Sequence, residues 1–161
     1  MFDSDSDSDS VIYMFRENDK AHGYDLESMF DKLVKLYDRS QGFEALFVAA
    51  ESGDLEKAKA LVEAGESLDE RDSEKRTPLI SAVIFNSIEV VRFFLEKGAS
   101  VDVIDKYHRT PLRYASQGNH FQIAQLLINA KASLDLIHPS EGSYLSTAAR
   151  NGSVEIFRLL L

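Results

Sequence analysis

The sequence reads Thr-Pro-Leu-Ile-Ser-Ala over residues 77–82 and Thr-Pro-Leu-Arg-Tyr-Ala over residues 110–115. The two stretches lie 33 residues apart, and looser copies occupy residues 44–50 and 143–149. One leucine thus recurs at this interval, as Leu46, Leu79, Leu112 and Leu145. A fixed period of this length is typical of stacked repeats, in which each unit buries its apolar face only against its neighbours.

The second half of each period predicts another helix. Shortly after each leucine comes a Gly or Asn, and apolar residues then follow at helical spacing. In one period, for example, Asn86 precedes Ile88, Val91, Phe94 and Leu95. Each complete unit closes on a short segment that ends in aspartate, at residues 64–69, 97–102 and 130–135.

With these motifs the chain resembles the ankyrin repeat family over residues 39–161. The resemblance implies an all-α solenoid of four repeats, each a helix, a turn, a second helix and a projecting hairpin-like loop. The repeats would span residues 39–71, 72–104, 105–137 and 138–161, the first degenerate and the last incomplete.

Local chemistry agrees with this reading. Thr77 and Thr110 are expected to cap first helices that begin with proline, where no hydrogen bond is lost. Gly65 and Gly98 are expected to end second helices in the left-handed conformation. Lys131 takes the corresponding position in the third repeat, so a left-handed turn there would be strained or built differently. Small residues are expected to let the helix layers approach closely, namely Ala49, Ala82, Ala115 and Ala148.

The chain departs from the family at one position of each first helix. The family usually has a histidine after the Pro-Leu pair, which forms hydrogen bonds between repeats. The residues at this position here are Phe47, Ile80, Arg113 and Ser146. We therefore expect that hydrogen-bond network to be absent.

The N-terminal residues predict two further segments. Residues 1–10 form an acidic Asp/Ser tail that cannot bury a core, and we expect it to be disordered. It would serve as a solubilising tail, a phosphorylatable tract or a mimic of a polyanion. Residues 11–38 combine a short strand-like segment with an amphipathic helix from Asp25, which we expect to form an N-terminal helical cap on the solenoid. A partner-binding helix is the alternative.

The charge of the chain is a second source of information. Its formal net charge is -9, and the first forty residues contribute ten acidic and five basic side chains to it. Such a chain should be repelled by nucleic acids and anionic membranes, so a protein with a basic surface is the more plausible charged partner. With no cysteine, no membrane-length apolar run and no signal peptide, we expect a soluble cytoplasmic protein.

No catalytic or metal-binding constellation is evident in the sequence. The four histidines lie outside metal-ligand spacing, and phosphate-loop and nucleophile-elbow motifs are missing. Asp69, Asp102 and Asp135 form a periodic carboxylate row, which we read as structural because the family usually bonds local backbone from this position. We therefore predict a protein that is not an enzyme and needs no cofactor.

The resemblance implies that partners are held by the loop tips and the outward residues of the first helices, which together form one concave face. Ile84 and Phe85 stand out as an apolar pair at positions expected to meet water, with burial by a neighbouring repeat as the alternative. Tyr107 and Arg109 are residue types enriched in binding hot spots, although Tyr107 also reads as an ordinary loop aromatic. The predicted partner-binding residues are Arg71, Ser73, Glu74, Arg76, Ile84, Phe85, Ile104, Lys106, Tyr107, Arg109, Gln117, Ser140, Glu141 and Arg150.

The sequence thus predicts a protein-protein interaction module. The alternative is a small acidic neutralising protein, either an immunity protein or an enzyme inhibitor, that occludes a basic toxin or enzyme. The last helix carries Val154, Phe157, Leu160 and Leu161 with no polar repeat after it. Because uncapped solenoid ends associate, we expect either a fragment of a longer array or a covered end, such as end-to-end self-association.

Overall fold

Residues 42–161 are the part of the chain that the computed structural model describes. The predicted acidic tail, strand-like segment and capping helix all fall outside these residues. The described part belongs to one compact unit, Ser40–Leu161. Its first helix covers residues 42–52. The others are α3 (Leu55–Glu63), α4 (Pro78–Ile84), α5 (Ile88–Glu96), α6 (Pro111–Gln117), α7 (Phe121–Asn129), α8 (Tyr144–Arg150) and α9 (Val154–Leu160).

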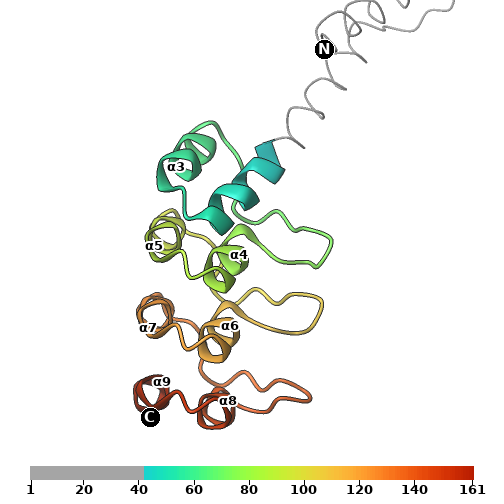
Figure 1. Cartoon of the computed structure of the whole chain (residues 1–161). Coiled ribbons are helices and arrows are strands. Elements are labelled where there is room, and N and C mark those ends of the chain that lie inside the picture. The colour runs from blue at the N-terminus through green and yellow to red at the C-terminus, as the bar shows by residue number, and fades with distance from the viewer. Residues whose placement is uncertain (1–41) are drawn as a thin grey trace, which may run out of the picture. The chain divides into compact units, whose positions relative to one another are not determined.

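The helices stack in two columns, as Figure 1 shows. The inner column consists of helix 42–52 with α4, α6 and α8, and the outer column consists of α3, α5, α7 and α9. Helices within a column pack on their neighbours, α4 on α6 and α6 on α8, and likewise α5 on α7 and α7 on α9. A loop precedes each of α4, α6 and α8 and projects away from both columns (Figure 1). The described residues therefore form the all-α repeat solenoid that the sequence predicts.

The core confirms the register of the 33-residue period. Leu46, Leu79 and Leu112 are buried at equivalent places, whereas Leu145 is half-buried beside the buried ring of Tyr144. The four periodic alanines, at positions 49, 82, 115 and 148, have no exposed surface at all. Side chains this small allow the inner and outer columns to approach closely, as expected.

The helix starts are built as the sequence predicts. The hydroxyl oxygen of Thr77 accepts a hydrogen bond from the backbone N–H of Ile80, and that of Thr110 accepts one from Arg113. Ser143 plays the same part before α8, at 3.2 Å from the backbone nitrogen of Ser146. These bonds satisfy amide groups that have no partner within the helix.

The helix ends use left-handed residues at the predicted positions. Gly65 and Gly98 have φ values of 101° and 84°. Lys131 keeps the same left-handed turn with φ 67°, a conformation that costs a residue with a Cβ free energy. A second left-handed position joins the two helices of each repeat, at Gly53, Asn86, Asn119 and Gly152.

Arg113 corrects the expectation that hydrogen bonds between repeats are absent at the family's histidine position. Its side chain is 2% exposed and reaches into the next repeat. There it donates hydrogen bonds to the carbonyl oxygen of Gly142 at 2.7 Å and to the hydroxyl oxygen of Thr147 at 2.5 Å. The longer guanidinium thus replaces an imidazole as the link between repeats. Ile80, one repeat earlier, is fully buried.

Two of the three periodic aspartates, Asp69 and Asp102, have a structural role, but their partners lie in the next repeat rather than in the local backbone as expected. Asp69 accepts a hydrogen bond from the hydroxyl of Ser100 at 3.0 Å, and Asp102 accepts one from the backbone nitrogen of Ser133 at 3.0 Å. Each carboxylate therefore holds the following repeat in place.

None of the helices within residues 42–161 has the length and apolar character required to cross a membrane.

Candidate partner-binding surface

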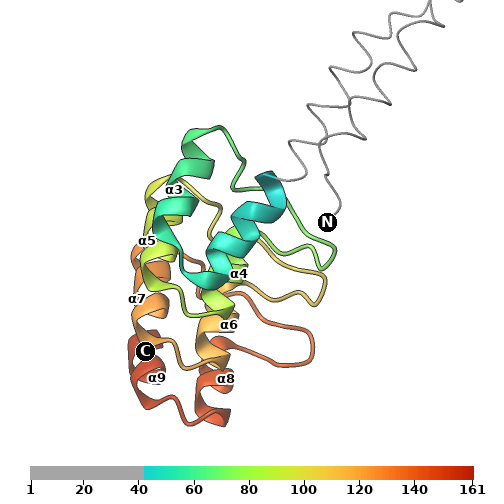
Figure 2. The same cartoon turned by 45° about the horizontal axis from the view of Figure 1, so that its top comes forward.

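Three hairpin loops and the inner helix that follows each of them form one continuous surface, seen from a second angle in Figure 2. The loops cover residues 71–76, 104–109 and 137–142, and the helices are α4, α6 and α8. We call this surface the loop face. We count Phe85, the residue that ends α4, as part of the loop face, and all the predicted partner-binding residues then lie on it.

The first two loops share one internal design. In the first, a carboxylate oxygen of Asp72 accepts hydrogen bonds from the backbone nitrogens of Glu74 and Arg76, at 2.8 and 2.9 Å. In the second, Asp105 accepts the equivalent bonds from Tyr107 and Arg109 at the same distances. One aspartate therefore folds each loop around itself.

The third loop uses a histidine in place of this aspartate. The Nδ1 atom of His138 accepts hydrogen bonds from the backbone nitrogens of Ser140 and Glu141, at 3.2 and 3.1 Å. Its Nε2 atom lies 2.6 Å from the carbonyl oxygen of Tyr107 in the second loop. Because a carbonyl only accepts, Nε2 carries the proton and donates it. The imidazole thus folds its own loop and also ties it to the preceding one.

Glu141 gathers several of the predicted binding residues. Its carboxylate accepts hydrogen bonds from Arg109, at 2.5 and 3.1 Å, and from Gln117 at 2.9 Å. The Nε atom of Arg113 lies 3.9 Å from the same carboxylate, and Arg150 donates to the Glu141 backbone carbonyl at 3.5 Å. These side chains hold the repeats together and are only partly free to meet a partner.

The first and second loops are joined in a similar way. The ammonium group of Lys106 lies 2.5 Å from the carboxylate of Glu74, and its backbone nitrogen donates to the Glu74 carbonyl at 2.9 Å. The hydrogen bond between the side chains lowers the pKa of Glu74 and raises that of Lys106. Arg71 donates to the carbonyl of Ile104 at 3.3 Å, and Arg76 pairs with Asp72 within its own loop.

The half-buried Tyr114 and the buried Arg113 lie beneath the loops. The hydroxyl of Tyr114 donates to Asp105 at 2.5 Å, and burial together with this bond raises the pKa of Tyr114 to about 12. The guanidinium of Arg113 lies 4.7 Å from the centre of the Tyr144 ring, and burial lowers the pKa of Arg113. The Tyr144 hydroxyl in turn lies 2.9 Å from that of Thr110. Hydrogen bonds among these side chains therefore support the loops from beneath.

The loop face exposes several large apolar side chains among its polar and charged ones. Phe85 and Tyr107 are about half exposed, at 54% and 49%, and Ile104 and Ile137 are exposed as well. Phe85 is the more exposed member of the apolar pair, and Ile84 is half-buried. Ser73 and Ser140 are exposed polar residues beside these apolar ones.

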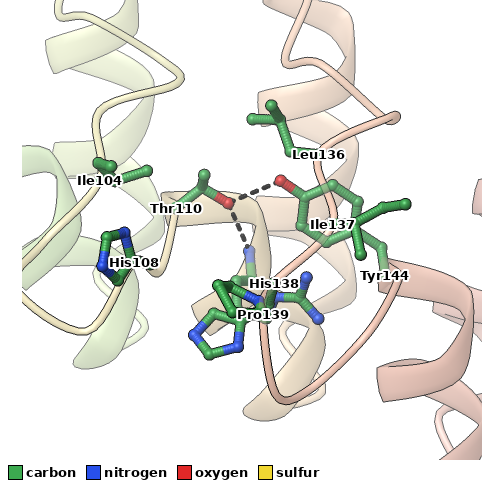
Figure 3. Close-up of a pocket in the computed structure, with 9 residues that line it drawn as sticks. Ile104, His108, Thr110, Leu136, Ile137, His138, Pro139 and Tyr144 are labelled. Carbon is green, nitrogen blue, oxygen red and sulfur yellow. Dashed lines mark hydrogen bonds between the residues drawn. The ribbon is translucent and has the colours of Figure 1, made fainter.

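A cleft of about 210 Å³ opens between the second and third loops (Figure 3). Its size is below that of most sites for cofactors or drug-sized ligands. The walls are mostly apolar, and Tyr144 with Thr110 forms part of the lining. The remaining lining residues are Ile104, His108, Arg113, Leu136, Ile137, His138 and Pro139. The sequence reading did not find this cleft, although the apolar pair Leu136-Ile137 in a loop was a signal for it.

Within residues 42–161, no group of three His, Asp or Glu side chains is placed to hold a metal ion.

A family model described as "Ankyrin repeats (3 copies)" matches the chain over residues 20–105 and 97–161. The comparison with curated proteins produced no match.

Proposed function

Because the chain belongs to the ankyrin repeat family, whose repeats generally mediate contacts between proteins, we propose that it binds a partner protein through the loop face. The observation that carries this proposal is the set of large apolar side chains exposed there. They are Phe85, Ile104, Tyr107 and Ile137. Clustered exposed apolar groups mark interaction sites, and aromatic residues are over-represented among binding hot spots.

The bonds within and between the loops also favour this role. Arg109, Glu141 and His138 fix the second and third loops to each other, and Lys106 with Glu74 fixes the first to the second. Apolar side chains on a fixed scaffold lose little conformational freedom when a partner binds. The predicted charged residues thus contribute by positioning the loops, and the apolar ones supply contact area.

The test compares two substitutions with similar exposure. Phe85 on the loop face is 54% exposed and Val154 on α9 is 60% exposed. We expect full-length protein carrying Phe85→Glu to lose the partner that the unchanged protein captures from its host cells, since a carboxylate at the interface would be desolvated without a counter-ion. Val154→Glu should keep that partner.

The proposal fails if the Phe85→Glu protein keeps the same partner, or if Val154→Glu loses it equally. Thermal unfolding of both variants guards against a simple folding defect. Ile84 is left unchanged because it is half-buried, so a charge there would test packing rather than binding.

A second candidate role is the small acidic neutralising protein, either an immunity protein or an enzyme inhibitor, acting on a basic target. Its support is the net charge of -9, to which the first forty residues contribute strongly. Recovery of a single basic enzyme in one-to-one ratio, with its activity lost in the complex, would favour this role. Recovery of several partners in variable ratio would favour a scaffold. We propose the cytoplasm as the compartment, in keeping with a chain that contains no cysteine.

A further inference from the structure

The loop face and the rest of the described chain have opposite net charge. The loop face carries seven basic side chains, Arg71, Lys75, Arg76, Lys106, Arg109, Arg113 and Arg150, against four acidic ones, Asp72, Glu74, Asp105 and Glu141. Elsewhere in residues 42–161 acidic side chains outnumber basic ones, thirteen to six. The loop face therefore has a net positive charge although the chain as a whole is negative.

The surplus positive charge belongs mainly to three exposed cations. Arg76, Lys106 and Arg109 are each neutralised by a carboxylate on the same face. Arg71 and Arg150 donate to backbone carbonyls, which are neutral, and neither has an ion pair within residues 42–161. Lys75 occupies the turn of the first loop with φ 59° and has no ion pair among residues 42–161.

The cleft between the second and third loops favours an apolar side chain over a charged one. Ile104, Leu136 and Ile137 present apolar surface to it. The one permanent cation in its lining, Arg113, is already bonded to two carbonyls and lies beside Glu141. A charged side chain would lose water there without gaining a free counter-ion, whereas an apolar side chain would be buried favourably.

We propose that the occupant of the loop face is an acidic segment of a partner protein that places one apolar side chain in this cleft. The proposal rests on the protein-binding function above and specifies its partner. Arg71 and Lys75 lie in the first loop and Arg150 follows the third, so the cleft is flanked by cations along the stack. Carboxylates on both sides of a central apolar residue match this order.

The proposal departs from the expectation of a basic partner, which came from the net charge of the chain. Charges at the interface decide which surface fits, because screening weakens charges more than about 10 Å away at ordinary salt.

The experiment is a selection from a random peptide library displayed on phage, with the full-length protein immobilised as the target. We expect the enriched peptides to be rich in Asp and Glu around an apolar residue. A synthetic copy of the most enriched peptide, labelled for fluorescence anisotropy, then serves as the probe for variants of the full chain.

Two variants and a matched control test the two parts of the site. Lys75→Gln should weaken peptide binding about three- to tenfold in dilute buffer, with the loss shrinking as salt is added. Ile137→Ser should weaken binding at low and high salt alike, because it removes a wall of the cleft. Arg158→Gln, an exposed cation on the outer helix α9, should change binding less than twofold.

Enriched peptides that are basic or uncharged, or an absence of any enrichment, would overturn the acidic occupant. If Ile137→Ser leaves peptide binding unchanged, the partner's apolar side chain does not lie in the cleft. If uncharged or basic peptides still lose binding on Phe85→Glu, the protein-binding function of the loop face stands and only the acidic partner fails. Peptides whose binding ignores Phe85→Glu as well as Ile137→Ser would contradict both.

Discussion

Substituting Glu141 by glutamine should destabilise the solenoid more than any other single exchange of a surface carboxylate on the loop face. The Glu141 side chain is only 16% exposed, and it accepts hydrogen bonds from Arg109 and Gln117. Its negative charge also lies near the buried guanidinium of Arg113. A glutamine amide keeps the shape but turns an N–H group toward one of these donors and removes the charge.

The expected cost lies between two known limits. Exposed ion pairs contribute about 0–1 kcal/mol, whereas removing one partner of a buried pair costs about 3–5 kcal/mol. Because Glu141 is mostly buried and Arg109 is partly exposed, we expect Glu141→Gln to lower the free energy of unfolding by about 2–4 kcal/mol. Glu74→Gln is the matched control, since Glu74 and its partner Lys106 are more exposed, and about 1 kcal/mol or less is expected.

Urea unfolding followed by circular dichroism measures both costs from the shift in midpoint, provided that the slope of the transition is unchanged. A double-mutant cycle adds a sharper test. In an Arg113→Met background no buried cation remains, so Glu141→Gln should cost less by roughly 1 kcal/mol. Equal losses in the free energy of unfolding for Glu141→Gln and Glu74→Gln would refute the idea that Glu141 stabilises the loops more than Glu74 does.

Four further predictions follow from the packing, the backbone, titration and the last helix. Leu112→Ala should cost about 2–5 kcal/mol in the same urea assay, because it opens a cavity at a fully buried site, and a loss near that of a surface site would contradict the register. Lys131→Gly should raise stability by about 1 kcal/mol, since φ 67° strains a residue with a Cβ; a decrease would show that the lysine side chain compensates. Stability should fall as pH rises from 10 to 12, because the pKa of Tyr114 is about 12 in the folded protein and lies near 10 when unfolded, so the unfolded state loses its proton first; Lys106 acts in the same direction, and Tyr114→Phe should reduce the slope without removing it. Sedimentation over a range of concentrations should reveal self-association that Val154→Glu weakens, since Val154 is exposed on α9, whereas a monomer at every concentration would exclude it.

The fold was predictable from the sequence because its determinants are local and recur. Leu79 and Leu112 indicate buried positions, and Thr77 and Thr110 indicate helix starts. The constant spacing between the two copies of this motif indicates the repeat. Burial and helix starts each depend on residues within a few positions of one another, and the repeat is detected because the same short pattern returns after 33 residues. Lys131 was identified for the same reason, since the backbone position it occupies is set by its own repeat.

The site was less predictable because its contacts cross between repeats. Arg113 bonds Gly142 and Thr147, which lie about one period away, and their placement depends on the backbone of the third loop. Ile84 and Phe85 differ in exposure although they are adjacent, since rotation by one residue at a helix end decides which side chain turns outward. The positive charge of the loop face could not be predicted from the net charge of the chain, because a net charge does not say where the charged residues lie.

The left-handed joints at Gly53, Asn86, Asn119 and Gly152 have a consequence for how such a chain can change length. They recur at the period of the leucines, so the two helices of every repeat are joined by the same backbone geometry. Adding or removing a whole period would preserve each joint, whereas adding one residue to α4 would move the bulky Phe85 into the left-handed position that Asn86 now occupies. Within the helical part of the solenoid, insertions and deletions should therefore be tolerated only as whole repeats. Shorter insertions should be tolerated at the tips of the hairpin loops, because they leave the joints unchanged.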